Sequence, residues 1–141
     1  MKDEILAKLE MLKGYAEILR GYRSHTLEEV KANSTLRGAI ERYLQVALEC
    51  TFDVGEMIIS LEGFRKPGTY KEVIEVLGEK GVLSREFVER FAPAAGFRNI
   101  LVHMYAEINV EKVHRFLQEN LEDFDDFAKQ IARYLMEKES A

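Results

Sequence analysis

Hydrophobic residues recur at intervals of three and four along most of the chain, which is the spacing of amphipathic helices. The first such stripe predicts a helix from about Asp3 to Tyr22. A second predicts a longer helix from Thr35 to Leu61, ended by Gly63. No segment has the alternating pattern of a strand of useful length. The pattern therefore predicts an all-α fold, an up-and-down bundle of four or five helices.

Capping residues mark where further helices begin. Thr26 with Glu29, and Thr69 with Glu72, have the spacing of a capping box. The first pair opens either a short helix or the long second one. The second pair predicts a short helix that ends near Gly78.

The second half of the chain contains one predicted break and one long closing helix. Ser84 is expected to cap a helix that carries the central motif, and Pro93 predicts a kink or break near Ala92. Asn109 is expected to cap the closing helix. Its apolar positions keep helical spacing for more than five turns: Val113, Phe116, Leu117, Leu121, Phe124, Ala128, Ile131 and Leu135.

Composition predicts one globular domain over residues 1–141. The chain is 47% hydrophobic and 32% charged, with two prolines, and is long enough to bury its own core. No apolar run approaches the roughly 18 residues of a membrane span, and the first residues do not form a signal peptide. We therefore expect a cytoplasmic location and no membrane contact. The lone cysteine, Cys50, is interpreted as a small buried side chain.

The net charge of −5 and a pI near 5.3 argue against a generic nucleic-acid binding protein, which is normally basic. Any contact with RNA must therefore be local. The arginines that could supply it form two groups in the sequence, Arg85, Arg90 and Arg98 in one and Arg37 and Arg42 in the other.

The most unusual stretch places a guanidinium and an imidazole inside an otherwise apolar helical segment, GFRNILVHMYAEIN. Arg98 and His103 lie roughly 140° apart around such a helix, whereas Asn99 and His103 share one side. Either Arg98 reaches around the helix, or a second copy of the motif faces the first across a dimer. Arginine can hold phosphate oxygens in a planar fork, and histidine can exchange a proton near neutral pH, so the segment suits chemistry at a phosphate.

Several kinds of site are not evident in the sequence. It contains no P-loop, no dinucleotide fingerprint and no His/Cys ligand cluster, so we expect neither a metal nor another cofactor. Cleavage of RNA without a metal requires a base, an acid and a cation near the phosphate. Because the motif holds one histidine per chain, two catalytic imidazoles would require a homodimer.

The motif RNILVHMY, an Arg-x4-His-x-Tyr pattern, resembles that of HepT-type toxins in the HEPN ribonuclease superfamily. The resemblance extends from about Arg37 to Phe127. It includes Glu49-x3-Asp53 in the long helix, the loop KPGTY and the phrase LGEKGVL.

The resemblance implies a HEPN-like helical fold and a metal-independent endoribonuclease toxin that cleaves RNA, tRNA being one candidate substrate, at a composite site in a homodimer. It implies catalytic roles for Arg98 and His103, with Asn99 orienting the imidazole or the substrate. It also implies a partner, a nucleotidyltransferase antitoxin of the MNT type, which neutralises such toxins by attaching AMP to the motif tyrosine, here Tyr105. An added anion beside the phosphate site would block RNA by volume and by charge.

Other interpretations of the same residues remain open. Glu49 and Asp53 either hold Arg98 or a partner's arginine, or form an ordinary solvated face. Arg98 and His103 could instead be a buried pair that stabilises the bundle, and Tyr105 a core tyrosine. At the level of the whole protein, the alternatives are a HEPN module that binds a nucleotide or a nucleotidyltransferase without cleaving RNA, and an adaptor bundle without nucleotide chemistry.

Overall fold

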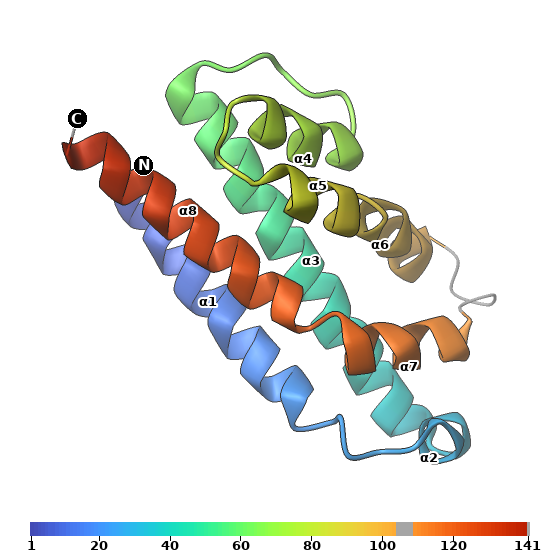
Figure 1. Ribbon diagram of the computed structural model, residues 1–141. Helices are drawn as coiled ribbons and strands as arrows, with labels where there is room; N and C mark the ends of the chain where they lie inside the picture. Colours follow the sequence, from blue (N-terminus) through green and yellow to red (C-terminus); the bar gives the residue numbers. More distant parts are fainter. Residues whose placement is uncertain (104–108, 141) are drawn as a thin grey trace.

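The computed structural model describes residues 1–103 and 109–140, and these residues form eight helices without a strand (Figure 1). The predicted all-α bundle is confirmed. The helices are α1 (Lys2–Arg20), α2 (Leu27–Ala32), α3 (Ser34–Glu62), α4 (Tyr70–Glu79), α5 (Arg85–Phe91), α6 (Ala94–His103), α7 (Val110–Glu119) and α8 (Glu122–Ser140). None of the helices within these ranges is long and apolar enough to cross a membrane.

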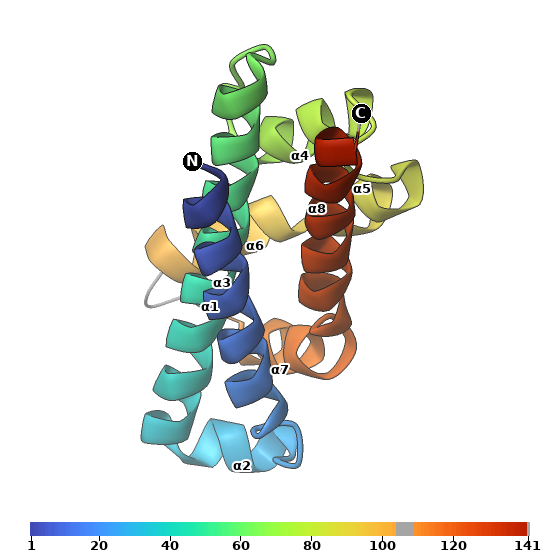
Figure 2. The same ribbon diagram turned by 90° about the vertical axis from the view of Figure 1, so that its left-hand side faces the viewer.

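The three longest helices, α1, α3 and α8, form the frame of the molecule. They run side by side, and α1 packs against both α3 and α8 (Figure 2). The apolar stripe of α1 provides the contact, because its members are buried at the predicted intervals: Ile5, Leu9, Leu12, Ala16 and Leu19. The shorter helices α4 and α6 pack against α3, and α5 packs against α4 and α8 (Figures 1 and 2).

The predicted N-caps are confirmed, with one difference in geometry. Thr26 opens the short helix α2 in a complete capping box, and Asn33 caps α3 separately. Thr69 accepts from the N–H of Glu72 at 3.1 Å, but the Glu72 carboxylate accepts from the N–H of Gly68 at 3.1 Å and does not complete the box. The hydrogen bond from Gly68 to Glu72 connects the loop before α4 to the first turn of that helix.

The break at Pro93 is also confirmed. Helix α5 ends at Phe91 and α6 begins at Ala94. Arg98 and His103 therefore lie on a separate helix, α6, and the helix that Ser84 caps does not carry them. Asn109 caps the next helix, as predicted, and accepts from the N–H groups of Glu111 and Lys112.

The prediction of one continuous closing helix is wrong, because the segment divides into α7 and α8 at Asn120 and Leu121. Asn120 leaves the helical conformation (φ −119°, ψ 2°), and the N–H of Asp123 bonds to its carbonyl at 3.1 Å. The bend allows α7 to pack against α2 while α8 packs against α1. The sequence pattern conceals the bend because Leu117, Leu121 and Phe124 stay buried and keep helical spacing across it.

Helices α3 and α4 approach closely at Gly55. A Cβ atom at this position would lie 2.6 Å from Cγ1 of Val73 and 3.2 Å from Cδ1 of Leu77, both buried. Gly38 lies in the same helix, and no described residue lies within 4 Å of the corresponding position. The two glycines therefore differ in what surrounds them and share the same helical backbone.

We expect Gly38→Ala to raise the free energy of unfolding by about 0.5–1 kcal/mol, because alanine favours the helix. Gly55→Ala gains the same propensity but overpacks the contact with α4, which costs about 1–3 kcal/mol. Urea denaturation of the two variants should therefore place Gly55→Ala below Gly38→Ala by about 1–3 kcal/mol. Equal stabilisation by both would contradict the close approach of α3 and α4.

Candidate functional site

Helix α6 presents the two principal motif residues in different environments. The Arg98 side chain is 13% exposed and points toward α3, whereas His103 is exposed at the end of the helix. Their positions follow from the five-residue spacing, which separates them around the helix axis. Within one protomer, the structure therefore does not bring the guanidinium and the imidazole together on one surface.

Arg98 is held by groups from three helices. Its Nη2 lies 2.9 Å from Oε2 of Glu49 on α3, and its guanidinium carbon lies 4.7 Å from the centroid of the Tyr70 ring on α4. Its Nη1 donates to Oδ1 of Asn99 at 3.2 Å. Tyr70 in turn stacks on Phe52 at 4.8 Å. An ion pair and a cation–π contact together compensate for removing the guanidinium from water.

One donor of the Arg98 side chain finds no partner among residues 1–103 and 109–140. Its Nε atom is buried and makes no hydrogen bond to any of them. An unpaired buried donor costs free energy comparable to a lost hydrogen bond, so the site is not optimised for stability alone.

Of the two open interpretations of Glu49, contact with Arg98 is confirmed. Asp53, one turn further along α3, lies elsewhere: its carboxylate is 51% exposed and 3.6 Å from Nζ of Lys8 on α1. Of the two open interpretations, the structure places Glu49 on the arginine and Asp53 on a solvated face. Asp53 therefore does not contact Arg98 within this protomer.

Tyr105 lies outside the described residues, within the range 104–108.

Of the two open interpretations of Arg98 and His103, a buried salt-linked arrangement fits Arg98 alone, because His103 is exposed. Asn99 is exposed and contacts the guanidinium.

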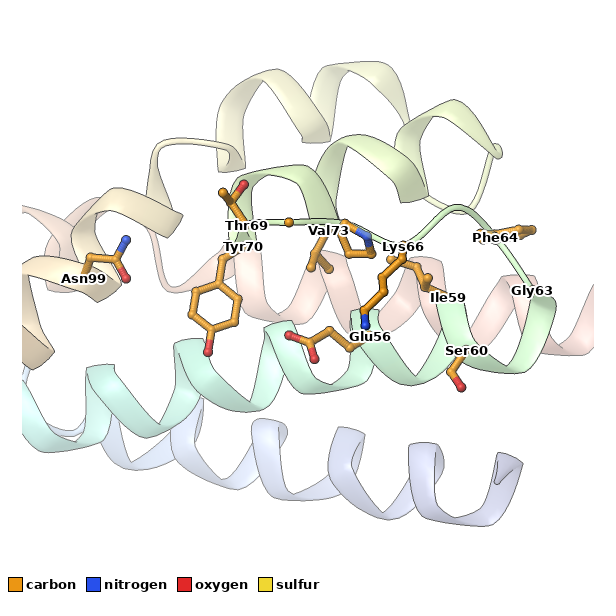
Figure 3. Close-up of a pocket in the computed structure, with 12 residues that line it drawn as sticks. Glu56, Ile59, Ser60, Gly63, Phe64, Lys66, Thr69, Tyr70, Val73 and Asn99 are labelled. Atoms are coloured by element: carbon orange, nitrogen blue, oxygen red, sulfur yellow. The ribbon is translucent and has the colours of Figure 1, made fainter.

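Asn99 also lines a cavity of about 660 Å³, here called the Tyr70 cavity. It lies between the second half of α3, the connection to α4 and the first turn of α4. Figure 3 shows Asn99 at one end and Gly63 at the other, with Tyr70, Glu56 and Lys66 directed into the space between them. The cavity therefore adjoins the arginine site through Asn99.

Tyr70 is the site residue to which the sequence assigned no role. Its position directly after the Thr69 cap is visible in the sequence, but an aromatic residue there is ordinary. Only the packing of α4 against α3 places its ring on Arg98.

No group of three His, Cys, Asp or Glu side chains within residues 1–103 and 109–140 is arranged to hold a metal ion. The interpretation of Cys50 as a buried side chain is confirmed, since it is 6% exposed and its Sγ lies 3.2 Å from the carbonyl oxygen of Lys8. Burial raises the pKa of the Cys50 thiol, which disfavours the reactive thiolate.

Removing the Glu49 carboxylate should leave a mostly buried guanidinium without its anionic partner. We expect Glu49→Ala to lower the free energy of unfolding by about 1–3 kcal/mol. The matched control, Asp53→Ala on the same helix, should change it by less than about 1 kcal/mol, because that ion pair is exposed. Urea denaturation provides the comparison, and equal effects would show that Arg98 does not depend on Glu49.

Comparison of the sequence with known proteins shows which family this chain is similar to. The family described as Ribonuclease HepT-like matches residues 11–131. The tRNA nuclease HepT of Aphanizomenon flos-aquae is 27% identical over 132 residues, covering 94% of this chain and 90% of that protein. The mRNA nuclease HepT of Shewanella oneidensis is 26% identical over 127 residues, covering 90% of this chain and 95% of that protein.

A solved structure shows the same arrangement of helices. The tri-AMPylated HEPN toxin of Shewanella oneidensis, in complex with an MNT antitoxin, superposes with a TM-score of 0.85 at 24% identity. The superposition covers 94% of this chain and 99% of that one. This similarity confirms the HEPN-like fold. Since the family match spans most of the sequence, the chain belongs to the HepT-like ribonuclease family.

Proposed function

We propose that this protein is a cytoplasmic, metal-independent endoribonuclease that acts as the toxin of a toxin–antitoxin pair. The observation that carries the proposal is the exposed His103 on a helix whose Arg98 is held in place by Glu49 and Tyr70, within a chain of the HepT-like ribonuclease family. The two HepT relatives are named as nucleases of different RNAs, tRNA and mRNA. RNA is accordingly the substrate class we propose, with tRNA as one candidate.

The reaction is attack of a ribose 2′-hydroxyl on the adjacent phosphorus. A base takes the proton of the 2′-hydroxyl while the new P–O bond forms. The bond to the 5′-oxygen breaks, and an acid protonates that oxygen. The products are a 2′,3′-cyclic phosphate and a 5′-hydroxyl. We assign the acid–base role to His103 and stabilisation of the phosphate charge to Arg98.

The proposed active form is a homodimer with facing motifs. In a single protomer, His103 is exposed, whereas Arg98 is mostly enclosed by its own subunit. A second protomer would supply a second imidazole, so that one acts as base and the other as acid. Asn99, which contacts the guanidinium, would orient the imidazole or the substrate, and Asp53 remains available to a partner's arginine.

The proposed regulation is AMPylation of Tyr105 by an MNT-type nucleotidyltransferase antitoxin. The solved HEPN toxin with 24% identity is described as AMPylated and bound to such an antitoxin, which supports a similar partner for this chain. An AMP group beside the phosphate site would exclude RNA by volume and by like charge.

A non-catalytic module that binds a nucleotide or a nucleotidyltransferase is the second candidate. The enclosure of Arg98 favours it, because a guanidinium engaged with Glu49 offers less charge to a phosphate. The two candidates differ in whether the purified protein cleaves RNA.

We expect the unmodified protein to cleave total RNA or a tRNA pool in the presence of EDTA, leaving 2′,3′-cyclic phosphate ends. His103→Ala should lower the rate by about 10²–10⁴-fold, because it removes the acid–base group. His25→Ala is the matched control: His25 pairs with Glu29 at the start of α2, and its loss should leave the rate unchanged. Arg98→Lys, which keeps the charge, tests the phosphate role with less risk of misfolding than Arg98→Ala.

Intact mass must accompany each assay. Absence of cleavage by a preparation without added AMP would reject the nuclease and favour the binding module. Absence of cleavage with added AMP would mean that the neutralised form had been assayed, and the unmodified protein would then be required.

We expect the protein coexpressed with its MNT-type partner to gain the mass of AMP, and Tyr105→Phe to lack this gain because the acceptor hydroxyl is absent. Tyr43→Phe is the control and should still be modified. Modification that persists in Tyr105→Phe, located by peptide mass spectrometry on another residue, would contradict the assignment.

A further inference from the structure

A second cavity, of about 450 Å³, lies between α6 and α7. Phe97 and Phe116 both line it and stack on each other, with centroids 4.8 Å apart and an interplanar angle of 1°. Both rings are half-buried, and Pro93 and Ile100 extend the apolar wall. We call this cavity the Phe97–Phe116 pocket. Aromatic and apolar walls of this kind suit the flat face of a nucleobase.

The rim of the Phe97–Phe116 pocket carries two cations that form no ion pair among residues 1–103 and 109–140. Lys112 and Arg115 on α7 line the pocket, and neither forms an ion pair with a described residue. Arg90, also in the lining, is by contrast engaged by Asp123 at 2.8 Å and Asp126 at 2.7 Å. In a chain with a net charge of −5, two unpaired cations beside an aromatic wall form a local site for a polyanion.

The Phe97–Phe116 pocket lies beside the exposed motif histidine. Ile100 lies one turn before His103, and Gly96, also in the lining, lies two turns before it on the same side of α6. The pocket wall therefore comes within about 5 Å of the level of His103 along the helix axis. A nucleotide bound there would be a near neighbour of a phosphate at the imidazole.

The Tyr70 cavity, which α6 lines through Asn99, suits a nucleotide less well. The Tyr70 ring is already engaged by Phe52 and Arg98. The one lysine in its lining, Lys66, shares the cavity with the carboxylate of Glu56 (Figure 3), which repels phosphate. Charge therefore distinguishes the two cavities.

We propose that the Phe97–Phe116 pocket binds a nucleotide of the RNA substrate next to the cleaved phosphate, with its base against the aromatic wall and its phosphates on Lys112 and Arg115. The proposal rests on the proposed ribonuclease function and adds a subsite to it. The occupant is single-stranded RNA, because a base can reach the wall only when it is unpaired.

The first test measures binding of a 2′-O-methyl RNA oligonucleotide, which lacks the attacking hydroxyl and stays intact. For Lys112→Ala/Arg115→Ala we expect the slope of log K against log salt to become shallower by about 1.4, since each phosphate contact on a single strand contributes about 0.7. At about 0.1 M salt this corresponds to a loss of roughly 25-fold in affinity. The control, Lys13→Ala/Lys129→Ala, removes the same charge from exposed positions on α1 and α8 and should keep the parent slope.

The second test locates the base. RNA carrying 5-iodouridine should crosslink on irradiation to peptides that contain Phe97 or Phe116, and the crosslinks should decrease in the Lys112→Ala/Arg115→Ala variant. Crosslinks confined to other peptides, or a parent slope in that variant, would overturn the subsite.

These outcomes are distinguishable from failure of the proposed function. A parent that cleaves RNA with a KM unaffected by the Lys112→Ala/Arg115→Ala change would leave the ribonuclease intact and reject the subsite. A parent that neither cleaves nor binds RNA would reject both. If the double variant instead loses self-association or the nucleotidyltransferase partner, and RNA binding is unchanged, the pocket is a protein contact and the proposal is wrong.

Discussion

The structure around Arg98 depends on interactions that compensate for the free-energy cost of burying its guanidinium. Arg98 can leave water only because Glu49 supplies an anion and Tyr70 an aromatic face, and these groups come from α3 and α4. Their positions in turn require that α4 approach α3 closely, which Gly55 permits. Arg98 thus connects α6 to both α3 and α4. The packing of these helices in the core therefore also determines the geometry of the site.

The sequence predicted most of the fold because local signals and long-range packing agree. The caps at Thr26, Thr69, Ser84 and Asn109, and the break at Pro93, follow from local hydrogen bonding that needs no tertiary information. The bend at Asn120 escaped prediction because burial continues across it, and hydrophobic spacing reports burial without reporting the path of the backbone.

The candidate site was predictable to a different degree at each residue. Spacing alone indicated that Arg98 and His103 face apart, and contact with an arginine was one of two open interpretations of Glu49. Asp53 is acidic like Glu49 and lies on the same helix. Its contact with Lys8, however, depends on the position of α1, which the hydrophobic periodicity of the sequence does not predict. The stacking of Tyr70 on Phe52 and the cavity between α6 and α7 likewise arise only when distant segments meet.

The break at Pro93 places Arg98 and His103 on a separate helix, α6, whose described part is ten residues long. Isolated helices of that length are marginal in water, so α6 owes its helical state to what it packs against and little to its own hydrogen bonds. When α6 separates locally from α3, its amide hydrogens would therefore exchange with solvent. The free energy of this local opening would be below that of global unfolding. The helical state of α6 thus depends on its contact with α3. A ligand that binds Arg98 and His103 only while α6 is helical would therefore also stabilise this helix.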